Sequence, residues 1–450
     1  MPIYLPACLR LARSCLFRRG VATRCKHILP IMATGKLKSE NFDTILTDDV
    51  MRIADLIQSV KRSDTGEGHE VRLVGGAVRD LLMDRAPKDV DLATTMLPEA
   101  MFDLCESSGF RTIATGLKHG TITVVTERGQ NVEITSLRVD QETDGRHATV
   151  KFTTDWQQDA ARRDLTINAM SLSLEGTLYD YFSGEQDILD RRVQFVGDPV
   201  KRIREDYLRI LRYFRFHGRI AKDPLVHDEI TITAIRELRD GLKQVSVERV
   251  CLEMAALVTG PNAPGELHTM YDVGVAERIR LPVPGRHDEF ERVWRVHHGY
   301  GGGDGAAEVK GRKLSFVSLL LALHDEETLM AAFAERWKLS RVQRALMVFV
   351  ADNRSRHGDL KHYQDMLTDA QAASKAHVEE VLAYQGRTDM ARAIADWPIP
   401  VMPVNGAMLK KHNIKNGPAM GAYLSTLRKL WQKSNFTLTA EDLLSNHLQN

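Results

Sequence analysis

The strongest constraint on the fold of this chain is a change of pattern near residue 198. Between Val71 and Asp180, short apolar runs of strand length alternate with short helical segments, whereas long helical periodicity follows Asp198-Pro199 and persists to the C-terminus. Mixed strands and helices followed by helices alone predict an α+β domain joined to an all-α region. At 450 residues the chain can bury more than one core, so we expect several domains.

We expect the α+β part, called the head, over residues 40–180. The helical region is expected to comprise a neck over 181–255, a body over 256–396 and a tail over 397–450, with breaks at the glycine-rich loop 299–305 and the proline-rich segment 397–403. Within the head, strands are expected at Val71–Val74, Val90–Ala93, Thr121–Thr126 and Val132–Ser136, and helices at Ala77–Met83 and Pro98–Ser107.

The first 39 residues carry eight Lys or Arg and no Asp or Glu. The whole chain has a net charge of +1, so the remaining residues carry about −7, and any nucleic-acid contact has to use local basic patches. Between Leu9 and Leu29, five arginines are interleaved with apolar side chains, which is typical of a mitochondrial targeting segment. We assign residues 1–31 to such a segment; a disordered basic tail that binds RNA is the alternative. Translation from Met32 would omit the segment and give a product for the cytoplasm or nucleus.

Composition argues against several classes of protein. No uninterrupted apolar stretch is long enough for a transmembrane helix. The five cysteines contain no CxxC pair, which fits a reducing compartment better than a zinc site or a disulfide scaffold.

A Gly-Gly turn at Gly75-Gly76 joins an expected strand to an expected helix. Two glycines let backbone N–H groups approach a ligand closely at a helix N-terminus, whose dipole favours anions. Arg79, in the first turn of that helix, adds a bidentate donor for phosphate. On its own, this pattern also fits an ordinary tight turn.

Two aspartates, Asp89 and Asp91, follow the turn on either side of Val90. Residues i and i+2 of a strand point to the same side, so the two carboxylates are expected to lie together despite their mutual repulsion. Carboxylate oxygens with no His or Cys nearby indicate a hard cation, and the phosphate-binding turn upstream indicates Mg²⁺. A solvated acidic strand edge is the alternative reading.

Glu133 offers a third carboxylate, between the apolar neighbours Val132 and Ile134. It either completes a two-metal cluster for attack of a hydroxyl on an α-phosphate, or is a buried glutamate satisfied by Arg138. The sequence leaves both possibilities open.

The ordered set of motifs resembles a known family. The strand, Gly-Gly turn, helix and DxD arrangement is similar to the nucleotidyltransferase superfamily that includes DNA polymerase β, and the combined set resembles the class II (bacterial and eukaryotic) CCA-adding enzymes. The matching stretches are GGAVRDLL, KDVDLATT, HGTITV, VEITSLR, TDGRHATV, FTTDWQQDAARRDLTINAM, YDYFSGEQDI and EDYLRILRYFRF. Similarity to animal mitochondrial members continues to the end of the chain, through VSVERV and WPIPVMPVNG. The resemblance implies a polymerase-β-like head with a mixed sheet, Mg²⁺ held by Asp89 and Asp91, and addition of the 3′-terminal CCA to tRNA from CTP and ATP.

The adjacent arginines Arg162 and Arg163 open a polar loop and suit phosphate or ribose hydroxyls. The resemblance implies that Arg163 contacts the nucleotide and that Asp164 and Asn168 belong to the motif that selects ribose over deoxyribose. A structural ion-pair network is the alternative.

Asp206 and Arg209 are expected to share one face of a helix, at spacing i and i+3. Asp accepts and Arg donates, which matches the amine and ring nitrogen presented by cytosine and by adenine, whereas uracil and guanine present the reverse pattern. Buried polar groups facing like groups cost several kcal/mol, enough to select C and A without a nucleic-acid template. A surface salt bridge is the alternative. The resemblance implies this template role and adds Arg212 and Arg215 as nucleotide contacts.

Accepting first C and then A requires the pocket to change. The residues Asp144, Gly145, Arg146 and His147 resemble the family's flexible loop, although a static turn has the same appearance. Expected partners are tRNA, CTP and ATP, with neither membrane nor DNA, for a monomer or homodimer. The alternative functions are a poly(A) polymerase, a partial CC- or A-adding enzyme, or an inactive tRNA-binding scaffold.

Overall fold

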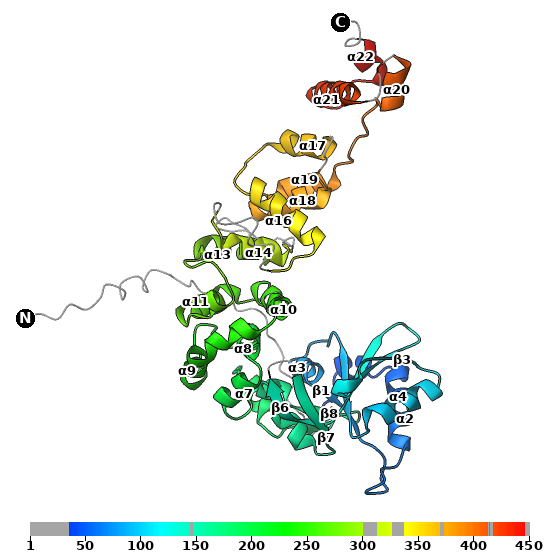
Figure 1. The fold of residues 1–450 in the computed structure, drawn as a ribbon, viewed down its shortest axis with the longest axis vertical. Helices are drawn as coiled ribbons and strands as arrows, with labels where there is room; N and C mark the ends of the chain where they lie inside the picture. Colours follow the sequence, from blue (N-terminus) through cyan, green and yellow to red (C-terminus); the bar gives the residue numbers. More distant parts are fainter. Residues whose placement is uncertain are drawn as a thin grey trace, which may run out of the picture. The chain divides into compact units, whose positions relative to one another are not determined.

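The computed structural model describes residues 36–144, 147–299, 313–325, 337–369, 373–412, 414 and 417–445. They form two compact units (Figure 1). The first unit runs to Gln141 and resumes over Val150–Asp190; the second takes Glu142–Thr149 and continues from Arg191. The expected targeting segment, 1–31, lies outside the described residues.

A seven-stranded mixed sheet forms the centre of the first unit, in the order β3-β4-β5-β2-β1-β8-β9. Strands β2 and β5 run parallel, and the other neighbours are antiparallel. All four strands expected from the sequence are present, each within one residue of its expected bounds. The strands of the sheet are β1 (Val71–Val74), β2 (Val90–Thr94), β3 (Arg111–Gly116), β4 (Thr121–Val125), β5 (Asn131–Ser136), β8 (Ser171–Ser173) and β9 (Leu178–Tyr179).

One face of this sheet is apolar and carries the core of the first unit. The strand register places one fully buried side chain of each central strand in a continuous row, formed by Leu172, Leu73, Leu92, Ile134 and Ile122. Helices α2 (Asp48–Ser59) and α4 (Pro98–Ser107) pack against the sheet and against each other (Figure 1). Alternation along each strand therefore leaves the residues next to this row, Asp91 and Glu133 among them, on the opposite face.

The remaining elements of the first unit are short. They are α1 (Glu40–Ile45), α3 (Gly76–Leu82), η2 (Leu117–His119), α5 (Trp156–Ala161), η3 (Thr166–Asn168) and α6 (Gly184–Leu189). Helices α3 and α4 confirm the two helices expected in the head. Helix α6, which we placed in the neck, lies in the first unit, where it contacts η3 and α3. Strands β6 (Arg138–Asp144) and β7 (His147–Phe152) pair as a separate two-stranded sheet.

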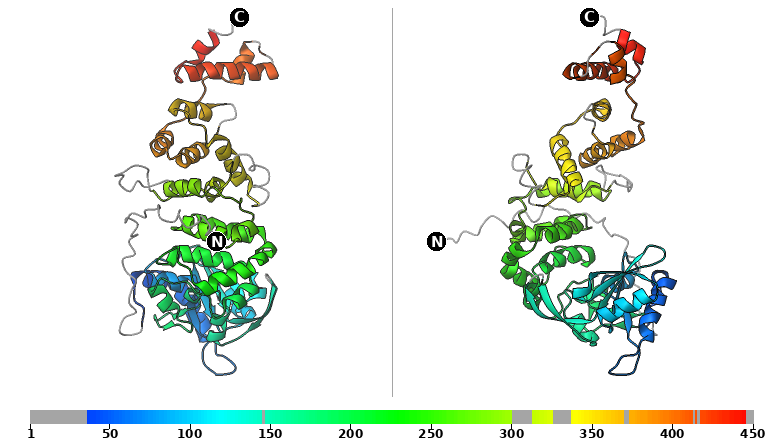
Figure 2. Two further views of the ribbon diagram at one scale, coloured as in Figure 1. Left: turned by 90° about the vertical axis from the view of Figure 1, so that its left-hand side faces the viewer. Right: turned by 45° about the vertical axis from the view of Figure 1, so that its right-hand side comes forward.

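The described elements of the second unit beyond Arg191 are helical (Figure 2). They are α7 (Pro199–Glu205), α8 (Arg209–Ile220), α9 (Glu229–Leu238), η4 (Arg239–Gln244), α10 (Val247–Val258), α11 (Ala263–Asp272), α12 (Val275–Arg278), α13 (His287–His297), α14 (Phe316–Ala322), α16 (Arg341–Asn353), α17 (Leu360–Thr368), α18 (Lys375–Tyr384), α19 (Thr388–Asp396), α20 (Gly406–Lys411), α21 (Pro418–Lys433) and α22 (Ala440–Ser445). The expected order of an α+β head and an all-α continuation is confirmed.

Two apolar clusters divide the later helices. One joins α17, α18 and α19 through residues such as Leu367, Leu382 and Ile394, and the other joins α20, α21 and α22 through residues such as Leu409 and Trp431. The segment expected to be the tail thus has a hydrophobic cluster of its own. In the part of the chain that the structure covers, no helix has the length and apolar character needed to cross a membrane.

Candidate active site

The acidic cluster lies on the polar face of the first unit's sheet. Asp91 in β2 is paired in register with Glu133 in the parallel neighbour β5, and Asp89 stands one residue before β2 begins. Asp91 is partly buried, whereas Asp89 and Glu133 are exposed. The alternative of a buried Glu133 satisfied by Arg138 is therefore wrong, because strand alternation turns this side chain outward to solvent.

The carboxylates of this cluster repel one another. Burial, followed by the charges of Glu133 and Asp89, raises the pKa of Asp91 to about 6, whereas the charge of Arg163 acts in the opposite direction. Protonation of Asp91 relieves the repulsion at low pH, and a bound cation would relieve it at neutral pH. The donor set is made of hard carboxylate oxygens, which fits Mg²⁺ or another hard divalent ion.

The Gly-Gly turn is shaped by two arginines. Gly75 has a φ of +65°, in the region that favours glycine, and a Cβ at this position would lie 3.1 Å from Nη1 of Arg163. A Cβ at Gly76 would lie 3.5 Å from Nη2 of Arg79. The two guanidinium groups therefore rest against the two glycines, which places two positive charges where the chain enters α3.

Hydrogen bonds fix both guanidinium groups. Arg79 donates from Nη1 to the Asn168 side-chain oxygen at 2.7 Å, and Arg163 donates from Nη1 to the Asn168 carbonyl at 3.3 Å. The amide of Asn168 donates to Asp164 at 3.3 Å. Because Asp164 and Asn168 are both buried, they organise the loop that carries Arg163.

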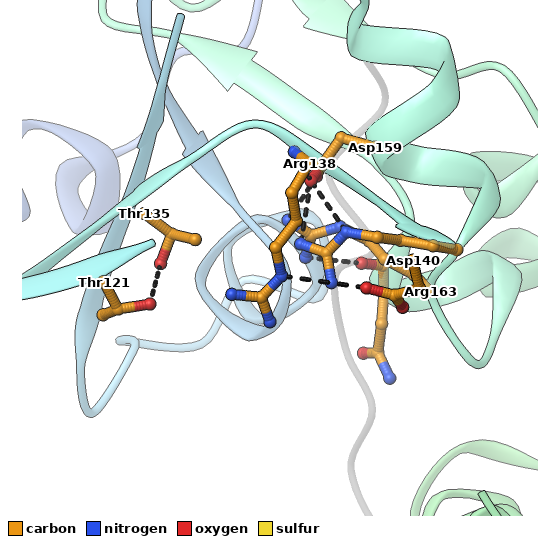
Figure 3. A network of polar contacts seen from close by, with 8 residues as sticks. Thr121, Thr135, Arg138, Asp140, Asp159 and Arg163 are labelled. Atoms are coloured by element: carbon orange, nitrogen blue, oxygen red, sulfur yellow. Dashed lines mark hydrogen bonds and ion pairs between the residues drawn. The ribbon is translucent and has the colours of Figure 1, made fainter. Parts of the chain in front are cut away.

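Behind Arg163 lies a buried ion-pair network (Figure 3). Asp159 on α5 pairs with Arg162 at 2.8 Å and with Arg163 at 3.2 Å. The alternative that we considered for the two arginines, a structural ion-pair network, is thus present, and it includes the residue expected to contact the nucleotide. Nearby, the hydroxyls of Thr121 and Thr135 lie 3.0 Å apart on neighbouring strands (Figure 3).

The candidate base-selecting residues lie in the second unit, at a break between two helices. Helix α7 ends at Glu205, Asp206 has an extended backbone, and α8 begins at Arg209. The expectation of one continuous helix through Asp206 and Arg209 is therefore wrong. The Asp206 side chain accepts a hydrogen bond from the Leu208 N–H at 3.1 Å, and such local bonds compete with helix formation.

Both residues have charged partners in this arrangement. Asp206 accepts from Nη2 of Arg249 at 2.6 Å, and Arg209 donates from Nη1 to Glu205 at 2.6 Å and to the Arg202 carbonyl at 3.0 Å. One turn further along α8, Arg212 and Arg215 both pair with Glu253 of α10, at 3.6 Å and 3.0 Å.

The expected flexible loop is described only at its edges. Asp144 ends β6 and His147 begins β7, while Gly145 and Arg146 lie outside the described residues. The loop's role stays a prediction.

Several residues of these networks were not anticipated, namely Asp159, Glu205, Arg249 and Glu253. Asp159 carried a readable signal, because it precedes Arg162 and Arg163 by three and four residues, the spacing of helical ion pairs. Arg249 and Glu253 are distant in sequence from their partners and carried no such signal.

One group of described residues in the second unit has the composition of a metal site, namely His217, His227 and Glu266. Its histidine nitrogens already have hydrogen-bond partners, which are Glu266 and the Val226 carbonyl for His217, and Tyr213 and Thr269 for His227. The two rings also stack, with centroids 4.0 Å apart. We therefore interpret this group as a buried hydrogen-bond network.

Comparison with known proteins gives consistent likenesses. A family model described as the Poly A polymerase head domain matches residues 71–194. The mitochondrial CCA tRNA nucleotidyltransferase 1 of Danio rerio is 40% identical over 430 residues, covering 94% of each chain, and that of Homo sapiens is 40% identical over 421 residues, covering 92% of each.

Solved structures show the same fold. The Bacillus stearothermophilus CCA-adding enzyme in complex with CTP matches with a TM-score of 0.70 at 24% identity, covering 88% of this chain and 94% of the other. The Thermotoga maritima CCA-adding enzyme complexed with tRNA matches with a TM-score of 0.59 at 17% identity, covering 90% and 97%. The expected fold class is confirmed by these likenesses.

Proposed function

The chain belongs to the family of CCA-adding tRNA nucleotidyltransferases, and we propose how its residues carry out the reaction. The enzyme adds the 3′-terminal CCA to tRNA without a nucleic-acid template. The 3′-hydroxyl oxygen of tRNA forms a bond to the α-phosphorus of CTP or ATP, the bond between the α- and β-phosphates breaks, pyrophosphate leaves, and the hydroxyl proton passes to solvent. The observation that carries the site assignment is the pairing of Asp91 with Glu133 in the first unit, within electrostatic reach of Arg163.

Asp89 and Asp91 are the proposed ligands of the divalent metal, which we take to be Mg²⁺, with Glu133 as a third catalytic carboxylate. The oxygen-only donor set and the raised pKa of Asp91 both fit a cation at this place. When bound, the ion lowers the pKa of the attacking hydroxyl and balances charge on the departing pyrophosphate.

The triphosphate is assigned to the Gly75-Gly76 turn with Arg79 and Arg163. The absence of a Cβ at either glycine leaves room for both guanidinium groups beside the backbone, and a guanidinium binds phosphate oxygens in bidentate fashion. Asp164 and Asn168 are assigned to the ribose side of the nucleotide. Because both side chains are buried, we propose that they act there by fixing the position of Arg79 and Arg163 as well as by direct contact.

Base selection is assigned to Asp206 and Arg209, with Arg212 and Arg215 as further nucleotide contacts. A carboxylate acceptor beside a guanidinium donor is complementary to cytosine and adenine and mismatched to uracil and guanine. The loop formed by Asp144, Gly145, Arg146 and His147 is the proposed element of the change from CTP to ATP.

The named partners of related structures, tRNA, CTP and ATP, are accordingly the proposed partners of this chain, with the tail contacting tRNA. Its full-length relatives are named mitochondrial, and we propose the same compartment here, with a cytoplasmic and nuclear form if translation starts at Met32. We propose a monomer or homodimer that binds neither DNA nor membranes.

Incubating the protein with tRNA that lacks its 3′-terminal CCA, Mg²⁺ and each nucleoside triphosphate in turn tests the proposal. We expect addition of CC from CTP alone and of the final A only once ATP is supplied. Long A tracts would instead indicate a poly(A) polymerase, addition of only CC or only A a partial enzyme, and tRNA binding without incorporation a scaffold.

A further inference from the structure

Asp159 is the most heavily engaged carboxylate beside the candidate active site. It lies on α5 with 3% of its surface exposed. Its Oδ1 accepts hydrogen bonds from the Arg138 backbone N–H at 3.2 Å and from Nε and Nη2 of Arg162 at 2.9 and 2.8 Å. Its Oδ2 accepts from Nη2 of Arg163 at 3.2 Å (Figure 3). Oδ1 thus binds the backbone and Arg162, and Oδ2 binds Arg163.

Arg163 has one ion-pair partner among the described residues, and it is Asp159. The other nitrogen of its guanidinium donates to the Asn168 carbonyl and lies against Gly75. One terminal nitrogen of the guanidinium therefore binds Asp159, and the other lies beside the Gly-Gly turn. From this position the charge of Arg163 acts on Asp91. Without Asp159, a long and flexible arginine would have to be ordered by a single neutral hydrogen bond.

Asp159 lies in a cluster of charged side chains. Arg138, Arg162 and Arg163 face the two carboxylates Asp159 and Asp140, with Arg138 and Asp140 4.0 Å apart. Burial, followed by the charge of Arg162, lowers the pKa of Arg138 to about 10. Asp159 thus lies among three arginines, two of which it binds through its carboxylate oxygens.

We propose that Asp159 is a positioning residue that holds Arg163 in the orientation in which its guanidinium meets the triphosphate of CTP or ATP. This inference rests on the proposed contact between Arg163 and the nucleotide. In this role Asp159 acts through the arginine and makes no contact of its own with substrate or metal.

The test is a double-mutant cycle that combines Asp159→Asn with Arg163→Met. An asparagine keeps the shape of the side chain, but its amide group turns a donor toward an arginine donor. We expect kcat/KM for both CTP and ATP to fall about 10- to 100-fold in Asp159→Asn, since a small misplacement of a binding group has effects of this size. The double variant is expected to lose no more than Arg163→Met alone, because the positioned group is already missing.

Melting temperature and tRNA affinity are measured for every variant, and Asp155→Asn is the matched control. Asp155 is an exposed carboxylate on the N-cap of the same helix, where asparagine also caps well, so its kinetics should stay at the wild-type level. Losses that multiply in the double variant would show that Asp159 acts on folding alone and would overturn the proposal, as would wild-type kinetics in Asp159→Asn.

A second variant covers the case in which Asp159→Asn does not fold. Arg162→Lys keeps the charge but cannot bind Oδ1 through two nitrogens, so we expect a rise of about threefold to tenfold in the KM for both nucleotides, absent in the Arg163→Met background. An unchanged KM contradicts the positioning role. Wild-type activity in Arg163→Met would refute the contact between that arginine and the nucleotide, and a wild-type protein that adds no nucleotides would refute the function itself.

Discussion

The buried pair His217 and Glu266 makes a specific prediction about stability. Nε2 of His217 lies 3.1 Å from the Val226 carbonyl, which can only accept, so this nitrogen carries the proton. In a neutral ring Nδ1 is then an acceptor, and the carboxyl group of Glu266, 2.8 Å away, has to donate. Burial lowers the pKa of His217 to about 4 and raises the pKa of Glu266 well above its usual range, in agreement with a neutral pair.

Glu266→Gln should therefore replace the protonated carboxyl group with an amide that donates the same hydrogen bond. In the wild type, the folded state keeps a proton on Glu266 that the unfolded chain releases above pH 4.5, so this group stabilises the fold at low pH and its contribution is lost as the pH rises. The slope is at most about 1.4 kcal/mol per pH unit, over the pH range in which the folded protein keeps this proton. The glutamine has no such proton to hold.

The assay is urea denaturation of both proteins at several pH values between 6 and 8. We expect the stability of Glu266→Gln relative to the wild type to rise with pH, by at most about 1.4 kcal/mol per pH unit. The contribution of His227, whose lowered pKa removes stability as the pH falls below about 6.5, is common to both proteins. Glu237→Gln, an exposed substitution on α9, is the control and should show no such trend.

A pH-independent difference would refute this reasoning. So would a glutamine variant that is less stable by several kcal/mol throughout, because that result would mean that Glu266 is an ionised partner of a protonated His217.

Three further predictions concern catalysis. Asp89→Asn should abolish incorporation of CTP and ATP while leaving tRNA affinity nearly unchanged; full activity in a primer-extension assay would contradict the metal assignment. Asp206→Ala should relax base choice, which competition between CTP or ATP and UTP or GTP would reveal, and undiminished rejection of UTP and GTP would remove its template role. Gly75→Ala should lower kcat/KM about tenfold or more, because an alanine would be strained at a φ of +65° and its Cβ would lie only 3.1 Å from Arg163. A fully active variant would show that the turn and the arginine can move apart freely.

The central strands and the acidic cluster could be predicted because local pattern and fold agree there. Val71–Val74 and Val132–Ser136 are apolar runs bounded by turn residues. In the sheet, every second side chain of these strands faces the core, as the row from Leu172 to Ile122 shows. The parallel pairing that brings Asp91 beside Glu133 is a long-range register, which no local pattern contains. Sequence therefore identified the carboxylates individually and only the structure brought the two strands together.

Two other features show where periodicity is insufficient. The helix break at Asp206 arises from a side chain that bonds to the Leu208 N–H, and the same sequence fits an uninterrupted helix equally well until that bond is seen. The partners Arg249 and Glu253 lie on α10, so their ion pairs with Asp206 and Arg215 depend on how the helices of the second unit pack. Side-chain chemistry indicated which groups could complement Asp206 and Arg209, but it did not indicate that Arg249 and Glu205 are their partners in this structure.

We expect the partners Arg249 and Glu205 to affect how tightly a nucleotide binds, but not which nucleotide is preferred. In the proposed binding mode, a base competes with Arg249 for Asp206 and with Glu205 for Arg209, and this competition is the same for all four nucleotides. It therefore weakens binding without changing the preference, because specificity depends only on differences between bound states. In that binding mode, cytosine and adenine supply an acceptor to Arg209 and a donor to Asp206, whereas uracil and guanine place a donor against Arg209 and an acceptor against Asp206. Arg249→Met should consequently tighten binding of CTP and ATP while the ratio of their kcat/KM to that of UTP stays unchanged; a collapse of that ratio would mean that Arg249 holds Asp206 in its selecting orientation.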